Sequence, residues 1–374
     1  MKSSRLLRVF CVGALAAICS FGLAACGGSD SDSAMADVSD TSGGVAATVN
    51  GVEIGENAVT DYIAAFRTNS GLEDDAAWAQ WLVDNDYTIK QIRSDVIDYY
   101  VSQELIRQAA AENDVTVEAK EVDAQVETMR GYYQSEEEWQ EALKSLGTTE
   151  DQYRSMLELS MLQSGLQEKV AKATEPTKEE MLQYAQMYGS AYNGAKKSSH
   201  ILFNADDEAT AKEVLEKINS GELDFAEAAK EYSQDTGSAQ DGGNVGWDKL
   251  NTFVEEYQTA LDGLEVDQVS QLVTSDYGIH IIKCTAVFNA PEEITSPDQL
   301  PDEFTDSIKN TLEASSKETA YAKWYEEYKE GAKIEVNKMP EDLPYKVSLK
   351  GVTKTPTQDE TTEGTLELEG ETQE

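Results

Sequence analysis

The fold is decided by two short runs that read Ser198-Ser199-His200-Ile201-Leu202-Phe203 and Tyr277-Gly278-Ile279-His280-Ile281-Ile282-Lys283. The whole sequence holds only two histidines, and each run contains one of them. Both runs are rich in aliphatic and β-branched residues, which is typical of a strand. Two neighbouring strands can place both imidazoles on the same face of a sheet. The runs therefore indicate a paired-histidine site built on a small sheet.

The residues between the two runs alternate helix and strand signals. Asp206 or Asp207 can cap a first helix, which Gly221 ends because glycine readily adopts the left-handed conformation found after helices. This mixture of helices with a small sheet predicts an α+β domain. The other elements expected here are a helix from Asp224, a short strand over Val245-Gly246-Trp247, a helix over 252–261 and a strand over 269–274.

The chain before this domain is predicted to be mainly helical. Val45 to Ile54 gives two short strands around Asn50-Gly51, which is a strong hairpin signal. From Glu56 to Tyr192 apolar residues recur at helical spacing. Aromatic and methionine side chains are frequent there, and the sequence leaves open whether they pack a core or hold unfolded polypeptide. Helix starts with capping-box spacing are Ser135/Glu138, Thr149/Gln152 and Thr177/Glu180.

A proline-rich loop and a last helix follow the domain. Pro291, Pro297 and Pro301 predict a loop over 290–301. Apolar residues from Phe304 to Tyr328 then predict one long amphipathic helix. Because such a helix needs a partner surface, we expect it to fold back on the N-terminal helices.

The first residues have the pattern of an export signal. Lys2, Arg5 and Arg8 precede an apolar run, as in a secretory signal peptide. The run ends at Leu23-Ala24-Ala25-Cys26, which resembles the lipobox of bacterial lipoproteins. The resemblance implies cleavage before Cys26, lipidation of its sulfur and anchorage at the outer face of the cytoplasmic membrane. Of the remaining cysteines only Cys284 lies outside the signal, so no internal disulfide can form and a small buried hydrophobe is expected there.

Five motifs together resemble the parvulin-type peptidyl-prolyl isomerase domain from about Lys196 to Val287. With the lipobox and the flanking helices, the whole chain resembles PrsA-type extracytoplasmic foldases, and its N-terminal part is similar to the chaperone portion of SurA. The motifs are His200-Ile201-Leu202, Gly221-x-x-Asp224-Phe225, Tyr232-Ser233-Gln234-Asp235, Gly242-Gly243-x-x-Gly246-Trp247 and Tyr277-Gly278-x-His280-Ile281-Ile282.

The resemblance implies an α+β parvulin domain, an antiparallel four-stranded sheet with helices, inserted between a helical chaperone domain and a C-terminal helix. Low apolar content predicts disorder at both ends. The expected order is a signal peptide (1–25), a flexible tether (26–44), a SurA-like chaperone domain (45–194), the parvulin domain (195–288), a C-terminal helix packed on the chaperone domain (289–338) and a disordered acidic tail (339–374).

The resemblance also implies roles for individual residues. His200 and His280 match the paired histidines at the floor of the site, Asp235 stands where the family has Cys or Asp, and Ser275 matches a hydroxyl bonded to the histidines. The expected apolar wall for the proline ring is Val245, Phe253 and Tyr257. Asn244-Val245 stands where Asp-Leu is commoner, which enlarges or softens one wall. No cofactor and no metal are implied.

The implied function is prolyl isomerisation and chaperone action on unfolded secreted polypeptides. A second hypothesis is a holdase whose parvulin domain binds chains without isomerising them. No Gly-x-Ser-x-Gly motif supports a serine hydrolase, and the distant histidines without a cysteine pair do not support a zinc site. A solute-binding lipoprotein is disfavoured by the helical N-terminal half. The net charge of −41 argues against nucleic acid as a partner, and whether the chain forms a homodimer is left open.

The loop after the first strand predicts the substrate class. It reads Asn204-Ala205-Asp206-Asp207-Glu208 and is acidic, whereas phosphate-reading parvulins carry a basic cluster there. A phosphate before proline would meet carboxylates and no arginine. The sequence therefore predicts that phosphorylation is not required, provided that Lys196 and Lys197 point away from the site.

Overall fold

The computed structural model describes residues 38–355, so the predicted signal peptide and the predicted lipidation site Cys26 lie outside the described residues. The chain divides into two compact units. Of the described residues, unit 1 combines 38–172 with 319–355, and unit 2 comprises Ala173–Glu318. No helix within the described range is both long and apolar enough to cross a membrane.

Unit 1 pairs a small sheet with a set of helices. Its three strands are antiparallel in the order β2-β1-β7. Asn50 and Gly51 have φ values of 49° and 92°, which confirms the predicted hairpin. The elements are β1 (Val45–Val49), β2 (Val52–Gly55), α2 (Glu56–Asn69), α3 (Asp75–Asp84), α4 (Ile89–Glu112), α5 (Ala119–Arg130), α6 (Glu136–Ser145), α7 (Glu150–Val170), the second half of α12 (Asp302–Gly331) and β7 (Ile334–Val336).

The helix starts follow the predicted side-chain caps. The side chain of Thr149 accepts a hydrogen bond from the main-chain N–H of Gln152, and the Gln152 side chain accepts from the N–H of Thr149. Thr177 forms the same reciprocal pair with Glu180. Ser135 accepts from the N–H of Glu138, but the Glu138 carboxylate accepts from the N–H of Gln134, so the capping box predicted there is only half formed. These contacts satisfy N–H groups that have no partner inside the helix, so they determine where each helix begins.

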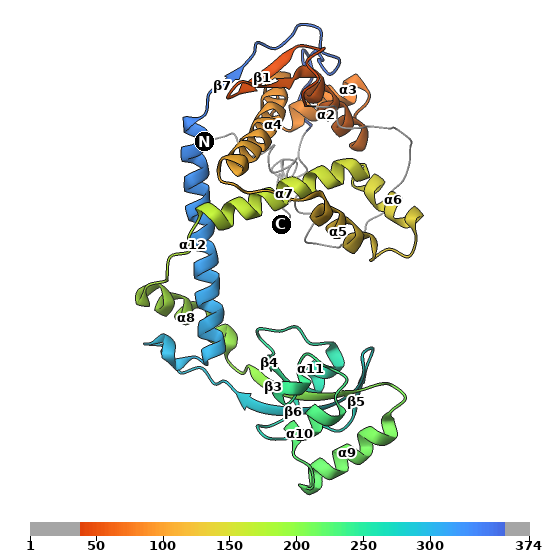
Figure 1. Ribbon diagram of the computed structural model, residues 1–374, viewed down its shortest axis with the longest axis vertical. Helices are drawn as coiled ribbons and strands as arrows, with labels where there is room; N and C mark the ends of the chain where they lie inside the picture. The colour runs from red at the N-terminus through yellow and green to blue at the C-terminus, as the bar shows by residue number, and fades with distance from the viewer. Residues whose placement is uncertain (1–37, 356–374) are drawn as a thin grey trace, which may run out of the picture. The chain divides into compact units, whose positions relative to one another are not determined.

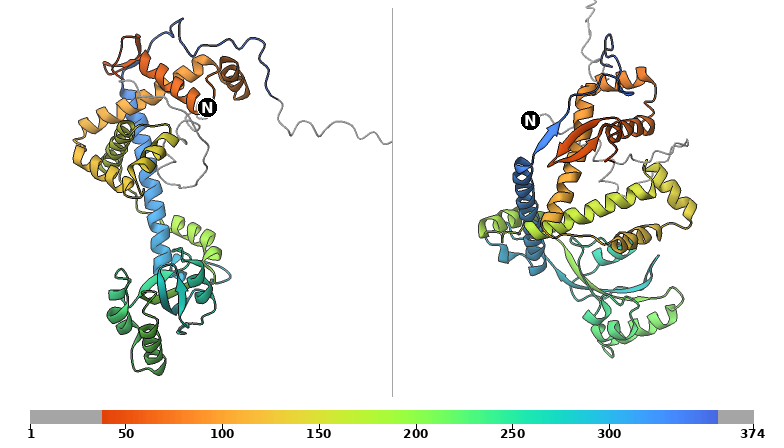
Figure 2. Two further views of the ribbon diagram at one scale, coloured as in Figure 1. Left: turned by 90° about the vertical axis from the view of Figure 1, so that its right-hand side faces the viewer. Right: turned by 45° about the horizontal axis from the view of Figure 1, so that its top comes forward.

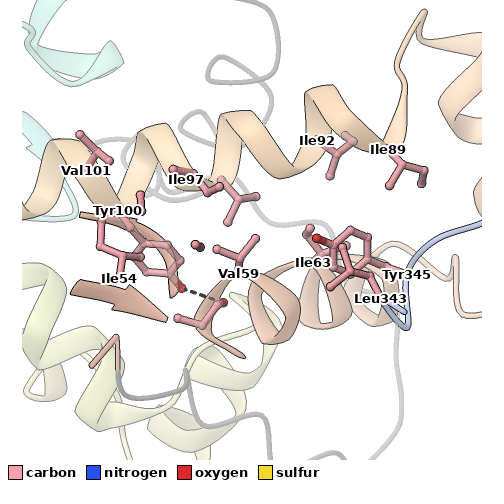
Figure 3. Close-up of a cluster of buried hydrophobic side chains, with 14 of the residues drawn as sticks. Ile54, Val59, Ile63, Ile89, Ile92, Ile97, Tyr100, Val101, Leu343 and Tyr345 are labelled. Atoms are coloured by element: carbon pink, nitrogen blue, oxygen red, sulfur yellow. Dashed lines mark hydrogen bonds between the residues drawn. The ribbon is translucent and has the colours of Figure 1, made fainter. Parts of the chain in front are cut away.

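The main core of unit 1 lies between α2, α4 and the sheet (Figure 3). Tyr100 of α4 is 2% exposed, and its hydroxyl donates to the carbonyl of Ala58, 3.3 Å away. Figure 2 shows α4 beside the three strands from a second direction. The residues of α4 that face this core recur at three- and four-residue spacing, as the amphipathic pattern predicts.

The C-terminal segment is part of this core, which corrects the prediction of a disordered tail from residue 339. Leu343 and Tyr345 are 9% and 2% exposed. The carbonyl of Tyr345 accepts a hydrogen bond of 3.0 Å from Nε1 of the buried Trp78. The predicted tether also begins to pack earlier than expected, because Val38 lies against the same core and its carbonyl accepts from the N–H of Gly55. A few apolar side chains are enough to order these polar segments.

A second, smaller core of unit 1 is built on an aromatic residue of α6. Trp139 is 2% exposed and packs against Tyr153 of α7 at a ring distance of 5.5 Å. Tyr321 of α12 lies in a third cluster with Leu166 of α7 and Ala109 of α4, so the part of α12 in unit 1 packs on these two helices. Most aromatic side chains of this region therefore pack cores, whereas Tyr132 is 73% exposed.

Unit 2 contains a four-stranded antiparallel sheet in the order β4-β3-β6-β5, which confirms the predicted α+β architecture (Figure 1). Ile201 and Ile281 on one face pack against α9 and α10. Ile282 and Cys284 on the other face pack against α11. The elements are α8 (Lys178–Tyr192), β3 (Lys196–Phe203), α9 (Glu208–Ser220), α10 (Phe225–Tyr232), β4 (Asn244–Trp247), α11 (Glu255–Asp262), β5 (Val273–Ser275), β6 (Gly278–Val287) and the first half of α12.

The strand predicted over 269–274 is shorter in the structure. Val269 forms one isolated bridge with Lys283, and regular pairing begins only at Val273. The interruption has a local cause, because the side-chain oxygen of Ser270 accepts the N–H of Ile282 at 2.9 Å. A serine side chain thus replaces the main-chain partner at this point.

Two helices outside the predicted parvulin boundaries, 195–288, belong to unit 2. Tyr192 of α8 stacks on Phe304 of α12 with ring centroids 4.2 Å apart. Phe304 also contacts Trp247 of β4 at 4.9 Å. Lys197 of β3 forms an ion pair with Glu303 of α12. The first half of α12 therefore packs on the sheet domain, and only the part from Thr319 onward belongs to unit 1.

Candidate functional site

The two histidines lie on adjacent strands and face the same side of the sheet. His200 of β3 pairs in register with Ile282, and Leu202 pairs with His280 of β6. Residues two apart on a strand share a face, so both imidazoles project toward α11. Their Nδ1 atoms are 3.2 Å apart, and the side chains are almost entirely buried.

Each imidazole has a second partner on its outer side. Nε2 of His200 lies 2.8 Å from Oδ2 of Asp235, which follows α10. Nε2 of His280 lies 2.8 Å from Oγ of Ser275, the last residue of β5. The predicted group of His200, His280, Asp235 and Ser275 is therefore brought together in one row.

The row has one consistent arrangement of protons when both histidines are neutral. The Asp235 carboxylate only accepts, so His200 must carry its proton on Nε2 and accept at Nδ1. His280 then donates from Nδ1 to His200, and its Nε2 accepts the hydroxyl proton of Ser275. Every donor in the row points from Ser275 toward Asp235.

Burial and hydrogen bonds shift the pKa values of His280 and Asp235 in the row. Burial, and then the neighbouring His200, lower the pKa of His280 to about 4, so His280 is neutral at pH 7. Burial alone would raise the pKa of Asp235, but hydrogen bonds from Ser238, His200 and the N–H of Gly237 outweigh it and hold that pKa below its usual value. Asp235 is therefore an anion at one end of the row, and His280 is a neutral imidazole.

An aromatic wall covers the two histidines. Tyr257 of α11 is 3% exposed, and its ring lies edge to face with His200 at 5.7 Å and with His280 at 5.6 Å. Phe253 lies 4.7 Å from the Tyr257 ring. Val245 is half-buried in the same cluster, so all three residues predicted for the apolar wall lie in one place.

The glycine motif before β4 brings the main chain against the first histidine. The carbonyl of Gly243 accepts the N–H of His200 at 2.8 Å. A Cβ on Gly243 would lie 2.1 Å from the His200 carbonyl oxygen, and the φ of Gly243 is 77°. Only glycine fits such a position. The side-chain amide of Asn251 fixes the main chain of β4, because it donates to the carbonyls of Val245 and Trp247, each at 3.1 Å.

Two buried serines at the site were missed by the sequence reading. Oγ of Ser198 accepts the hydroxyl proton of Tyr257 at 3.1 Å. Oγ of Ser238 donates to Oδ2 of Asp235. The position of Ser198 could have been predicted, because Ser198 precedes His200 by two residues and therefore lies on the same face of the strand. The second depends on the path of a loop, for which the sequence holds no periodic signal.

Among residues 38–355, no group of three or more His, Cys, Asp or Glu residues is arranged to hold a metal ion. Cys284 is buried and free, as expected from the cysteine pattern.

Comparison with known proteins decides the family. A family model for the PPIC-type PPIase domain matches residues 200–286, and one for the SurA-like N-terminal domain matches residues 5–167. The foldase protein PrsA of Geobacillus kaustophilus is 34% identical over 209 residues, which cover 56% of this chain and 68% of that relative. The chain belongs to the PrsA foldase family.

Other PrsA proteins match over more of the chain. The foldase protein PrsA of Caldanaerobacter subterraneus is 29% identical over 311 residues, covering 82% of this chain and 90% of the relative. The solved structure of PrsA from Bacillus subtilis is 22% identical, covers 80% of this chain and 96% of its own, and gives a TM-score of 0.38. Within the PrsA family, the sheet domain described above is the parvulin-type isomerase domain.

Proposed function

We propose that this chain isomerises X–Pro peptide bonds in unfolded secreted polypeptides and acts on them as a chaperone. The observation that carries the proposal is the buried row Ser275, His280, His200 and Asp235 beneath the ring of Tyr257. Membership of the PrsA foldase family supports it. The holdase alternative has no separate observation in its favour.

The reaction needs shape and fixed dipoles rather than a nucleophile. Rotation of an X–Pro amide has a barrier of about 18–20 kcal/mol because resonance is lost, and no covalent bond is made or broken. A rigid polar floor beside an apolar wall can favour the twisted amide by matching its altered charge distribution. The row supplies the floor, and its single proton arrangement keeps the dipoles aligned.

The proposed roles of the individual residues follow from their places. His200 and His280 form the floor, and Asp235 and Ser275 fix the two ends of the row. Val245, Phe253 and Tyr257 hold the proline ring by apolar contact, and the exclusion of water strengthens the electrostatic effect of the floor.

We propose further that the substrate is unphosphorylated. Lys196 does not reach toward the site, because its Nζ donates to the carbonyls of Leu261, Asp262 and Leu264 at the end of α11. Lys197 is paired with Glu303. Both lysines that could have bound a phosphate are therefore engaged elsewhere, and the loop at 204–208 offers carboxylates.

The proposed location is the outer face of the cytoplasmic membrane, through a lipid on Cys26. The support is the lipobox-like Leu23-Ala24-Ala25-Cys26 after a charged and apolar leader. Two acyl chains anchor a protein stably, whereas one binds only marginally. The variant Cys26→Ser should release the protein into the medium, and retention of that variant in the membrane fraction would contradict the anchor.

The test of the catalytic proposal is a proline-peptide isomerisation assay on the full chain. Wild type should accelerate cis–trans exchange, and the double variant His200→Ala, His280→Ala should lose most of the acceleration. The matched control is Ser220→Ala, which alters an exposed serine on α9 of the same unit. Aggregation suppression measured in parallel separates the alternatives, because a holdase would retain it while showing no acceleration in the wild type.

A further inference from the structure

The path of the chain between α10 and β4 closes a ring of four hydrogen bonds around the first histidine. The N–H of His200 donates to the Gly243 carbonyl at 2.8 Å, and the N–H of Gly243 donates to the Ser238 carbonyl at 2.9 Å. Oγ of Ser238 donates to Oδ2 of Asp235, and Nε2 of His200 donates to the same oxygen. Main chain and side chain of His200 are thereby held through one residue, Ser238.

The turn that carries Ser238 leaves it little freedom. The N–H groups of Ser238 and Ala239 both donate to the carbonyl of Asp235, at 3.3 and 2.9 Å. The N–H of Gly237 donates to Oδ1 of the same residue at 3.1 Å. Ser238 is 5% exposed, so water does not compete for its hydroxyl.

The hydroxyl of Ser238 completes the set of donors that orient the carboxylate. Oδ1 of Asp235 is held by the N–H of Gly237, and Oδ2 receives both His200 and Ser238. Without Ser238 the carboxylate keeps one main-chain donor and can rotate about its χ2 bond, which is a soft torsion. His200 would then lose the fixed acceptor that selects its tautomer.

We propose that Ser238 is a positioning residue of the isomerase site, which acts on His200 and His280 through the orientation of Asp235. The proposal rests on the proposed function of the histidine row. It assigns Ser238 no contact with the substrate. It explains why a serine is buried in this loop, where its hydroxyl serves only the carboxylate.

The experiment compares Ser238→Ala with Ser238→Thr and with the control Ser220→Ala in the full chain. The imidazole ¹⁵N shifts are recorded without substrate, and kcat/KM is measured with a proline peptide. The Ala variant should show nitrogen shifts of both histidines moved toward a tautomer mixture and a loss of about tenfold in kcat/KM, the scale of one charged hydrogen bond. The Thr variant, which keeps the hydroxyl, should restore both.

A double-mutant cycle separates positioning from general stabilisation. If Ser238 acts through Asp235, adding Ser238→Ala to Asp235→Ala should cause no further loss of kcat/KM. Additive losses would overturn the proposal, as would unchanged nitrogen shifts in a folded Ser238→Ala variant. An unfolded Ser238→Ala variant would also overturn it by showing a structural role. Because the shifts need no turnover, an inactive wild type would contradict the proposed function without deciding the role of Ser238.

Discussion

Nδ1 of His200 lies 3.2 Å from Nδ1 of His280, so one proton serves both nitrogens. The residue at the end of the row, Asp235, determines which of the two rings carries this proton. The ionised carboxylate of Asp235 can only accept a hydrogen bond. The direction of the whole row is therefore set by the carboxylate, and Ser275 adapts by rotating its hydroxyl.

This asymmetry gives a spectroscopic prediction. At pH 7 we expect His200 as the Nε2–H tautomer and His280 as the Nδ1–H tautomer, read from long-range ¹H–¹⁵N correlations. The chain has two histidines, so the spectrum is simple to assign. Ser275→Ala should keep both tautomers, whereas Asp235→Ala should mix them. The same tautomers in Asp235→Ala would show that the carboxylate does not set the direction.

Acid should destabilise unit 2 through His280. Its pKa is about 4 in the fold and near 6.5 in an unfolded chain, so the unfolded state takes up protons first as the pH falls. His280 therefore makes its full contribution to the free energy of unfolding above pH 6.5. This contribution, about 3 kcal/mol in total, is lost progressively as the pH falls toward 4.

The measurement is the free energy of unfolding of wild type and His280→Asn between pH 4 and 7. The difference between the two proteins isolates His280 from other groups, such as Asp95 of α4, whose pKa burial raises to about 6 and whose effect has the opposite sign. A difference that does not change with pH would contradict the low pKa of His280.

The buried hydroxyl of Tyr257 should be coupled to Ser198. Removal of Ser198 leaves this hydroxyl without its acceptor, so Ser198→Ala should cost about 1–3 kcal/mol of stability. Tyr257→Phe alone should cost less, and the double variant should recover most of the loss due to Ser198→Ala. Thermal or urea unfolding of the four proteins gives the coupling energy, and additive effects would show that the contact is not energetically significant.

Substrate phosphorylation should weaken turnover. Matched peptides with Ser-Pro, phospho-Ser-Pro and Ala-Pro should give the lowest kcat/KM for the phosphorylated form, because the nearby lysines are engaged and the loop at 204–208 is acidic. Raised ionic strength should reduce the difference in kcat/KM between the phosphorylated and unphosphorylated peptides, because salt screens the charges. A preference for phospho-Ser-Pro would show that Lys196 or Lys197 leaves its partner.

The C-terminal segment should contribute to the stability of unit 1. Ending the chain at Lys338 removes Leu343 and Tyr345 and leaves Nε1 of Trp78 without its acceptor. Relative to a chain that ends at Thr355, we expect the free energy of unfolding to fall by about 2–5 kcal/mol because buried side chains are lost, and the unfolding midpoint to fall with it. Equal midpoints for the two truncated proteins would show that residues 339–355 add nothing to the core.

Local signals made most of this fold predictable. Capping boxes at Thr149 and Thr177 and the Asn50-Gly51 turn act within a few residues, so the sequence displays them directly. The group around His200 and His280 was predictable through the parvulin motifs. The packing of Tyr345 on Trp78 was not, because one buried aromatic in a polar segment leaves no periodic pattern. The boundary within α12 was also hidden, since a continuous helix gives no sign of which unit each half joins.

Strands β1 and β7 pair through Thr48 and Glu335, which lie at opposite ends of the described chain. A chain that is synthesised from its N-terminus therefore has β1 paired only with β2 until β7, at residues 334–336, becomes available. Unit 2 is one continuous segment and has no such delay. Loops that close over long separations form slowly. The order in which the two units can fold therefore follows from the connectivity of the chain. The isomerase segment can reach its native state while the N-terminal sheet is still incomplete.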